Sequence, residues 1–395
     1  MPGFEWFGDE ERKEVLDVLD TGVLFRYGFD QARKNNWKAK AFEAELAKRT
    51  GVRYCHLCAS GTAALSIALA SSGIGAGDEV VVPPFTFIAS IEAVLNAGAV
   101  PLFAEIDATL CLDPEGIAAV VTPRTKAILP VHMCGSMARI DEIQRFCKQN
   151  GFILIEDACQ SLGATFNGKA LGTFGQMGCF SFDPVKTATC GEGGAVVTDD
   201  KDLYTNADAY ADHGHDHIGN DRGLEGQLFL GANYRISELN AAVGLAQLRK
   251  LDAMLAKQRE HKKAIKEALT QFPEIEFRKI PDEKGDSATF LSFFLPDESE
   301  ARRVAADLGK AGVDACFYWY DNNWHYIRQW HHLKQLTCAA RLPLTLLESC
   351  PDYEKIELPR SDSIIGRTIS MLIKLSWTED ELQQRIEKIV QTLRG

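Results

Sequence analysis

The chain has 395 residues, of which 46% are hydrophobic and 25% are charged, a composition typical of a globular protein long enough for two domains. Its formal net charge of −12 argues against general nucleic-acid binding, because phosphate contacts need a basic surface. An anionic small substrate is still possible, since it needs only a local basic pocket.

The 11 cysteines are scattered along the chain and predict neither a zinc site nor a disulfide framework. Cys55 and Cys58 have the spacing of one metal-binding pair, but no second pair accompanies them. The first residues, MPGFEWFGDEERKEV, lack the pattern of a signal peptide, and no apolar run reaches membrane-spanning length. Because the cysteines show no disulfide framework, we expect them to be reduced, as in the cytoplasm. We therefore expect a cytoplasmic protein that binds no metal ion and no membrane.

The first part of the chain predicts two helices, at residues 10–19 and 39–49, separated by the aromatic and basic loop FRYGFD. From residue 53 onward, apolar strands alternate with helices. These strands are expected in the stretches YCHLCASG, DEVVVPPFTF, VPLFAEID, KAILPVHMCG, FILIEDA, MGCFSFD and GAVVTD. Apolar runs without polar alternation indicate burial on both faces, and alternation with helices indicates a mainly parallel sheet. Residues 1–250 are therefore predicted to form a large α/β domain.

A polar, histidine-rich loop is predicted at DAYADHGHDHIGNDR, followed by a long helix for which Ser237 can serve as N-cap. This helix leads to a smaller C-terminal α+β domain, predicted at residues 251–395. Its strands contain ATFLSFFLP and ISMLIKLSW, and it includes the aromatic loop FYWYDNNWHYIRQWHHLK.

Polar side chains fall at the predicted carboxyl ends of several strands, where open α/β sheets bind their ligands. Lys186 follows one such strand and precedes a glycine-rich turn. A lysine held between two strands can be partly desolvated, which favours its nucleophilic, neutral form. The alternative is an ordinary surface lysine in a hairpin, so the neighbouring motifs decide between the two.

Three of these motifs could hold a cofactor. Gly61 and Thr62 lie where a strand gives way to a helix, which suits an anion, although a plain N-cap has the same pattern. Asp157 closes a buried strand, where a carboxylate needs a cation, a helix N-terminus or a protonated ring nitrogen. Gln160 could lie over the same ring, and Ser181, just before the lysine, could contact a phosphate.

Phe87 adds an aromatic face at another strand end, although a phenylalanine is more often part of the core. An anion cradle, an aromatic platform, an acid for a ring nitrogen and an imine-forming lysine are together what pyridoxal phosphate requires. The set of motifs therefore predicts an enzyme that depends on this cofactor.

The motifs SGTAAL, PPFTF, GAVPLFAEID, EDACQSLGA, SFDPVKTATCGEGGAVVTD and GANYRISELNAAVGLAQL resemble, in order and spacing, those of the DegT/DnrJ/EryC1/StrS family of sugar aminotransferases. The resemblance covers most of the chain and implies the fold type I aminotransferase architecture. It implies that Lys186 forms the Schiff base with the cofactor, that Asp157 pairs with the pyridine nitrogen and that Gln160 packs against the ring. Phe87 takes the stacking position, where relatives often have Trp or Tyr. Some family members are dehydratases with a histidine at the lysine position, so the lysine favours transamination.

The resemblance also implies that Gly61, Thr62 and Ser181 hold the phosphate. Asn233 would reach the phosphate of a neighbouring subunit, which implies a homodimer with its active site at the interface. The amino donor is expected to be an amino acid, and we expect L-glutamate. No motif of the chain distinguishes glutamate from glutamine in this role.

Several loops, among them FRYGFD, VHMCGSM, ADHGHDHIGNDRG and the aromatic loop, resemble those of family members that aminate 3-deoxy-D-manno-octulosonate (Kdo), a lipopolysaccharide sugar acid, at a C8 aldehyde. A nucleotide-linked 4-keto-hexose is the alternative substrate, and a cofactor-binding regulator without turnover is the alternative outside enzymes. A sugar acid needs local cations, and arginine suits bidentate capture of a carboxylate. The candidates, each of which could instead be a solvated or structural residue, are Arg26, His213, His215, His217, His325 and Arg328.

Overall fold

The structure is a computed structural model that describes residues 2–219, 221–348 and 350–394. Its largest element is a seven-stranded sheet with the strand order β1-β9-β8-β5-β4-β2-β3. Strand β9 runs antiparallel to both of its neighbours, and the other neighbouring pairs are parallel, which confirms the mainly parallel sheet. The strands are β1 (Tyr54–Cys58), β2 (Glu79–Val82), β3 (Val100–Phe103), β4 (Thr125–Ile128), β5 (Ile153–Asp157), β8 (Met177–Ser181) and β9 (Gly194–Thr198).

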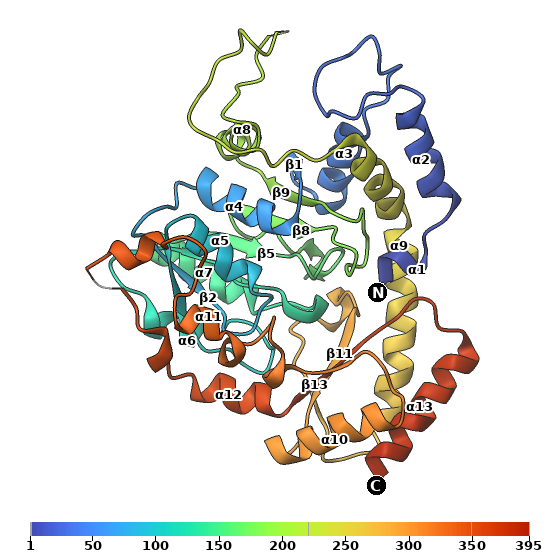
Figure 1. The fold of residues 1–395 in the computed structure, drawn as a ribbon. Coiled ribbons are helices and arrows are strands. Elements are labelled where there is room, and N and C mark those ends of the chain that lie inside the picture. The colour runs from blue at the N-terminus through green and yellow to red at the C-terminus, as the bar shows by residue number, and fades with distance from the viewer. Residues whose placement is uncertain (1, 220, 349, 395) are drawn as a thin grey trace.

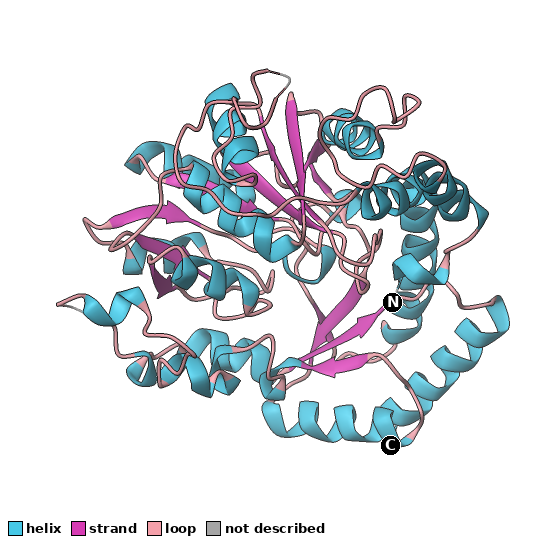
Figure 2. Ribbon diagram, turned by 45° about the horizontal axis from the view of Figure 1, so that its top comes forward, coloured by secondary structure: helices cyan, strands magenta, loops and turns pink. Residues whose placement is uncertain are grey.

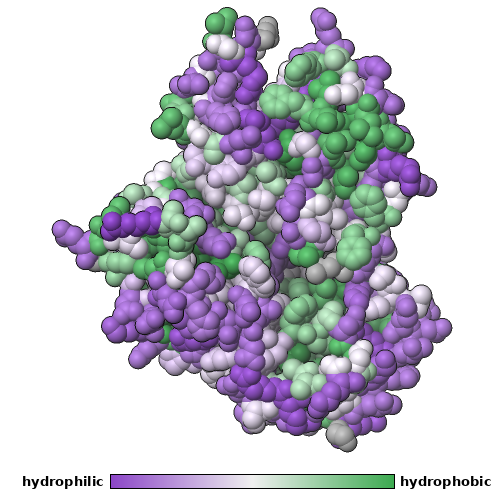
Figure 3. All heavy atoms as spheres, in the orientation of Figure 1, coloured by the Kyte–Doolittle hydropathy of each residue, from purple (hydrophilic) through white to green (hydrophobic). Residues whose placement is uncertain are grey.

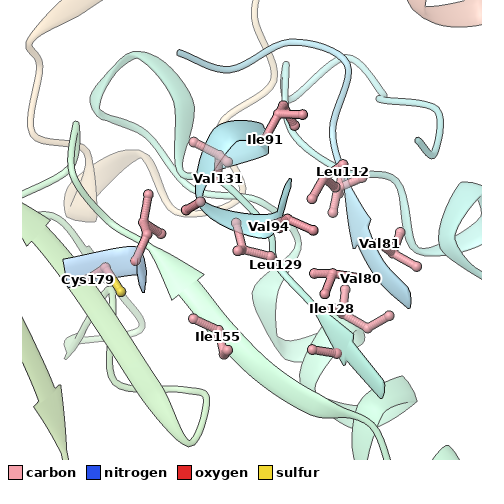
Figure 4. Packing of buried hydrophobic residues seen from close by; sticks show 14 of the residues in the cluster. Val80, Val81, Ile91, Val94, Leu112, Ile128, Leu129, Val131, Ile155 and Cys179 are labelled. Atoms are coloured by element: carbon pink, nitrogen blue, oxygen red, sulfur yellow. The ribbon is translucent and has the colours of Figure 1, made fainter. Parts of the chain in front are cut away.

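Helices lie on both faces of this sheet (Figures 1 and 2), which explains why its strands are apolar along nearly their whole length. Figure 4 shows part of the resulting core, in which Leu129, directly after β4, lies beside Val94 of α5. The helices of this part are α1 (Pro2–Glu5), α2 (Asp9–Leu19), α3 (Lys38–Thr50), α4 (Gly61–Ser71), α5 (Ala89–Asn96), α6 (Pro114–Val120), α7 (Ile140–Asn150) and α8 (Lys201–Tyr210).

The long helix α9 (Glu238–Leu269) begins as expected, with the Ser237 side chain accepting a hydrogen bond from the amide of Asn240. It runs from the large sheet to a second, four-stranded sheet (Figure 1). That sheet is antiparallel, with the order β10-β11-β13-β12. Its elements are β10 (Glu276–Phe277), β11 (Phe290–Phe294), α10 (Glu298–Lys310), β12 (Cys316–Tyr318), β13 (Thr368–Leu372) and α13 (Glu379–Arg394), and the short hairpin β6 (Thr165–Phe166) and β7 (Lys169–Ala170) lies elsewhere in the chain.

Between β12 and β13 the chain returns to the large sheet, and we call residues 319–366 the return segment. Its buried side chains, such as Tyr326 and Trp330, belong to the same apolar cluster as the strands of the large sheet. It carries α11 (His331–Lys334) and α12 (Pro359–Gly366), with 3-10 turns at Trp319–Asp321, Ile327–Gln329, Pro343–Leu346 and Tyr353–Lys355. A boundary near residue 250 thus stays a prediction, since part of the C-terminal chain packs with the first domain.

The return segment is joined to the loop after β2 by backbone hydrogen bonds. The amide of Thr86 donates to the carbonyl of His325 at 3.0 Å, and the amide of Ile88 donates to that of Trp324 at 2.9 Å. This pairing holds together two stretches that are more than 200 residues apart in the sequence. No helix among the described residues is long and apolar enough to cross a bilayer.

Candidate active site

A cavity of about 450 Å³ opens at the carboxyl ends of β5 and β8, beside the N-terminus of α4. The loop after β2 and the return segment close its other side. It brings together seven of the predicted cofactor residues from four separate stretches of the chain, namely Gly61, Thr62, Phe87, Asp157, Gln160, Ser181 and Lys186.

Lys186 lies in the loop between β8 and β9, and its side chain lines this cavity. A turn sets its backbone, because its amide donates to the carbonyl of Asp183 at 3.0 Å while its own carbonyl accepts from Gly3. Among the described residues, none forms a hydrogen bond or ion pair with its Nζ. The amine is therefore available to react with a ligand in the cavity.

Asp157 ends β5 and is buried, and both of its carboxylate oxygens have polar neighbours. Oδ2 accepts a hydrogen bond from the Ser90 hydroxyl at 2.7 Å, and Oδ1 accepts one from the amide of Cys159 at 3.1 Å. No cationic side chain of the described residues forms an ion pair with this carboxylate. A buried carboxylate without a cation is costly, so the geometry fits a positively charged group of a ligand, such as a protonated ring nitrogen.

The N-terminus of α4 forms a second part of the site. Ser60 caps the helix by accepting a hydrogen bond from the amide of Ala63 at 3.0 Å, which leaves other first-turn amides free for an anion. A methyl group at Gly61 would lie 2.7 Å from Cβ of Ser181 and 3.0 Å from its Oγ. Glycine at this position therefore lets the helix end come close to the serine hydroxyl, and together they fit a phosphate.

Aromatic side chains form the wall opposite the strand ends. Phe87 and Trp324 stack at 5.9 Å between ring centroids, and Phe317 and Trp319 stack at 4.8 Å. All four line the cavity. The aromatic loop thus contributes Trp324 and its neighbours to the wall, whereas its Tyr326 and Trp330 are buried in the apolar core.

His325 is the one predicted substrate residue that reaches this cavity within the described chain. Arg26 does not, because it is buried and its guanidinium donates to Glu43 and to the carbonyl of Leu57, both at 2.6 Å. Arg328 is likewise engaged by Asp362, at 2.7 and 2.8 Å. Neither arginine of this chain is free to hold a substrate carboxylate, which corrects the expectation for both.

The histidine-rich loop also lies outside the cavity lining. His215 contacts Glu225 through its Nδ1 at 3.3 Å, and His217 stacks on Tyr27 at 4.3 Å between ring centroids. His213 is exposed with a positive φ of 59°. Asn233 is exposed as well and does not line the cavity.

Sequence reasoning missed one buried hydroxyl group of the site, that of Ser90. Ser90 donates to Asp157, and the hydroxyls of Thr86 and Ser90 lie 2.8 Å apart. Ser90 is the second residue of α5. In the sequence, the only indication of its role was its closeness to the motif PPFTF. It became recognisable once the folded chain placed α5 over the end of β5.

The arrangement of a free lysine, a buried carboxylate and a phosphate cradle on a mainly parallel sheet defines a fold type I enzyme that binds pyridoxal phosphate. A profile of the DegT/DnrJ/EryC1/StrS aminotransferase family matches residues 7–390. The chain therefore belongs to this family, and it is a pyridoxal-phosphate-dependent aminotransferase.

Individual relatives agree with this assignment. The chain is 30% identical over 395 residues to the spore coat polysaccharide biosynthesis protein SpsC of Bacillus subtilis, covering 98% of this chain and 95% of SpsC. It is 41% identical over 247 residues to GDP-perosamine synthase of Caulobacter vibrioides, covering 62% and 63% of the two chains. An aminotransferase structure from Psychrobacter cryohalolentis superimposes with a TM-score of 0.84 at 28% identity, over 98% and 97% of the two chains. For several curated relatives, the match spans only 58–64% of the relative's length.

Replacing Gly61 with alanine is expected to weaken binding of the cofactor by about 10-fold or more, because overpacking of this kind costs about 1–3 kcal/mol. The added methyl would collide with Ser181 and push the helix end away from the phosphate. Titration of the apoprotein with pyridoxal phosphate, followed by absorbance, measures the change. Gly309→Ala is the matched control, because Gly309 lies in α10 with no atom within 4 Å of the new methyl. Equal affinity of the two variants would remove Gly61 from the cradle.

Proposed function

We propose that the protein transfers an amino group from an amino acid, L-glutamate, to a carbonyl carbon of a sugar. The observation that carries this proposal is the pairing of an unengaged Lys186 with a buried, cation-free Asp157 in one cavity. Membership in a family of aminotransferases supports the reaction type, and the name of one relative, GDP-perosamine synthase, supports a sugar as acceptor.

The bound cofactor supplies an aldehyde that carries the amino group and a ring that withdraws electrons from the reacting carbon. Lys186 would hold the cofactor through Nζ and would move a proton to or from the substrate carbon. Asp157 would pair with the protonated ring nitrogen. The first turn of α4 and the Ser181 hydroxyl would bind the phosphate, and Phe87 and Gln160 would pack against the ring.

We propose the C8 aldehyde of oxidised Kdo as the acceptor, giving 8-amino-3,8-dideoxy-D-manno-octulosonate for lipopolysaccharide. Lys186 is the only cation among the described residues that line the cavity, so the described lining offers no second cation for the carboxylate of a sugar acid. In this sugar the carboxylate stands at C1, at the far end of the chain from C8. A nucleotide-linked 4-keto-hexose is the second candidate, supported by the name of the relative that makes GDP-perosamine.

Half-reaction spectroscopy distinguishes these acceptors. Glutamate is expected to convert the cofactor to its amine form, which a regulator without turnover would not allow. The C8 aldehyde should then restore the original spectrum, with the amino sugar identified by mass spectrometry. Restoration by GDP-, UDP- or dTDP-linked 4-keto-hexoses alone would favour the second candidate, and restoration by none of them would reject sugar amination.

We further propose that the protein is a homodimer in which the loop carrying Asn233 contributes to the neighbouring active site. Figure 3 shows apolar side chains gathered over α2 and the loop that follows it. Exposed apolar residues occur both there and in the loop before α9, among them Leu16, Leu19, Phe29, Leu224, Leu228 and Leu230. A second copy would cover this surface. Sedimentation of the wild type and of Leu19→Glu tests the proposal, and a monomeric wild type would contradict it.

The free thiols of the cysteines suit a reducing compartment, and the cytoplasm is the location that we propose. The test is to locate an active fusion of this protein by microscopy in a cell that is able to export proteins.

A further inference from the structure

His325 stands in the wall of the cavity that contains Lys186. Its imidazole ring packs against Phe87 and Trp319, with ring centroids 5.5 Å and 4.8 Å apart. Its Nδ1 lies 2.8 Å from Oδ1 of Asn322. Among the described residues, none forms a hydrogen bond with its other ring nitrogen, Nε2, which leaves this atom to the contents of the cavity.

The contacts of Asn322 determine which ring nitrogen carries the hydrogen. The backbone amide of Trp324 donates to the same Asn322 atom at 3.0 Å, and because a backbone N–H can only donate, that atom is the amide oxygen. An oxygen accepts from both of its neighbours, so Nδ1 of His325 is the protonated nitrogen. In the neutral ring, Nε2 then keeps its lone pair and acts as a hydrogen-bond acceptor.

The surroundings also keep the ring neutral. Burial first, and then the positive charge of Lys186, lower the pKa of His325 to about 4. Asp157, Asp183 and Glu192 line the same cavity, but burial and Lys186 determine the direction of the shift. A histidine whose pKa is depressed in the folded state gains its charge only as the pH falls toward that value, so the ring is uncharged at neutral pH.

We propose that Nε2 of His325 accepts a hydrogen bond from a hydroxyl group of the substrate close to the carbonyl carbon that is aminated. This inference rests on the proposed sugar amination and names one of its specificity contacts. A carboxylate or phosphate oxygen has no hydrogen to donate, so the same nitrogen disfavours an anion at this point. His325 thereby selects a hydroxyl, and not the substrate carboxylate that a cationic histidine would bind. Asn322 is the positioning residue, since it sets the tautomer.

The state of the ring can be measured without turnover. Long-range ¹H–¹⁵N spectra of the ¹⁵N-labelled holoenzyme, with the signal assigned by its loss in His325→Gln, are expected to show a neutral Nδ1–H tautomer at about pH 7. The chemical shifts should not titrate between about pH 6 and pH 9. An Nε2–H tautomer, or a charged ring at neutral pH, overturns the proposal.

Kinetics then test the role of the acceptor. His325→Phe keeps an aromatic ring but removes both nitrogens, and it is expected to raise the KM for the sugar about 10-fold, the effect of one lost hydrogen bond. The rate with glutamate should change by less than about twofold. His325→Gln, which retains a polar group, should recover part of the loss, and exposed His332→Gln on α11 serves as the matched control.

Monodeoxy analogues of the accepted sugar identify the hydroxyl. One analogue is expected to show the same KM with the wild type and with His325→Phe, whereas the complete sugar distinguishes them. If His325→Phe raises the KM by the same factor for every analogue, the hydroxyl contact is contradicted. If no sugar is aminated, the proposed function fails while the NMR result still decides the state of His325; if a sugar is aminated without a KM penalty in His325→Phe, only this inference fails.

Discussion

Replacing Lys186 with alanine is expected to lower kcat about 10⁴-fold and to abolish the near-visible absorption band of lysine-bound cofactor. The loss is large because one amine performs two tasks, holding the aldehyde and moving a proton, and proton transfer by a positioned side chain alone contributes about 10²–10⁴-fold. No other lysine lines the cavity among the described residues, so the chain offers no substitute. Single-turnover rates with glutamate, and the absorption spectrum of the variant, measure both effects.

Lys148→Ala provides the control, because Lys148 is exposed on α7 and its loss should leave rate and spectrum unchanged. Borohydride reduction of the wild type followed by peptide mapping locates the attached cofactor directly. Attachment to any other lysine would overturn the assignment of Lys186.

Replacing Asp157 with asparagine is expected to slow both half-reactions by about 10²–10⁴-fold. Asparagine keeps the shape of the side chain but removes its charge, and losing one partner of a buried ion pair costs about 3–5 kcal/mol, where each 1.36 kcal/mol is about tenfold in rate. Because the ring nitrogen participates in both directions of transfer, the rates with the amino donor and with the sugar should fall together.

If the rates of both half-reactions fall together, Asp157 acts on the cofactor and not on one of the two substrates. A variant with a normal rate toward glutamate and a slow rate toward the sugar would place Asp157 at the substrate and not at the ring. Asp380→Asn, a change at an exposed position of α13, should alter neither rate.

The cofactor side of the cavity was predictable from the sequence, because the carboxyl ends of parallel strands meet at one edge of the sheet. Asp157 and Ser181 are the last residues of β5 and β8, so apolar runs ending in a polar residue were enough to place them. The loop carrying Lys186 follows directly from the second of these strands.

The substrate side was not predictable in the same way. A sequence shows that Arg26 is a potential anion-binding residue, but not that Glu43 lies 2.6 Å from it. The same holds for Arg328 and Asp362. For His325 the type of residue suggested a cation, whereas burial among aromatic rings reverses that expectation. Such outcomes depend on contacts between distant parts of the chain, which local patterns do not encode.

The backbone pairing of the loop after β2 with the return segment has a mechanical consequence. Phe87 belongs to one of the paired stretches, and Trp324 and His325 belong to the other. The wall facing Lys186 is therefore one frame joined by backbone hydrogen bonds, and a movement that separates its two halves has to break them. The enzyme then discriminates between acceptor sugars by the fixed shape of this wall. To accept a wider range of sugars, substitutions have to change the shape of the wall, and greater flexibility elsewhere does not suffice.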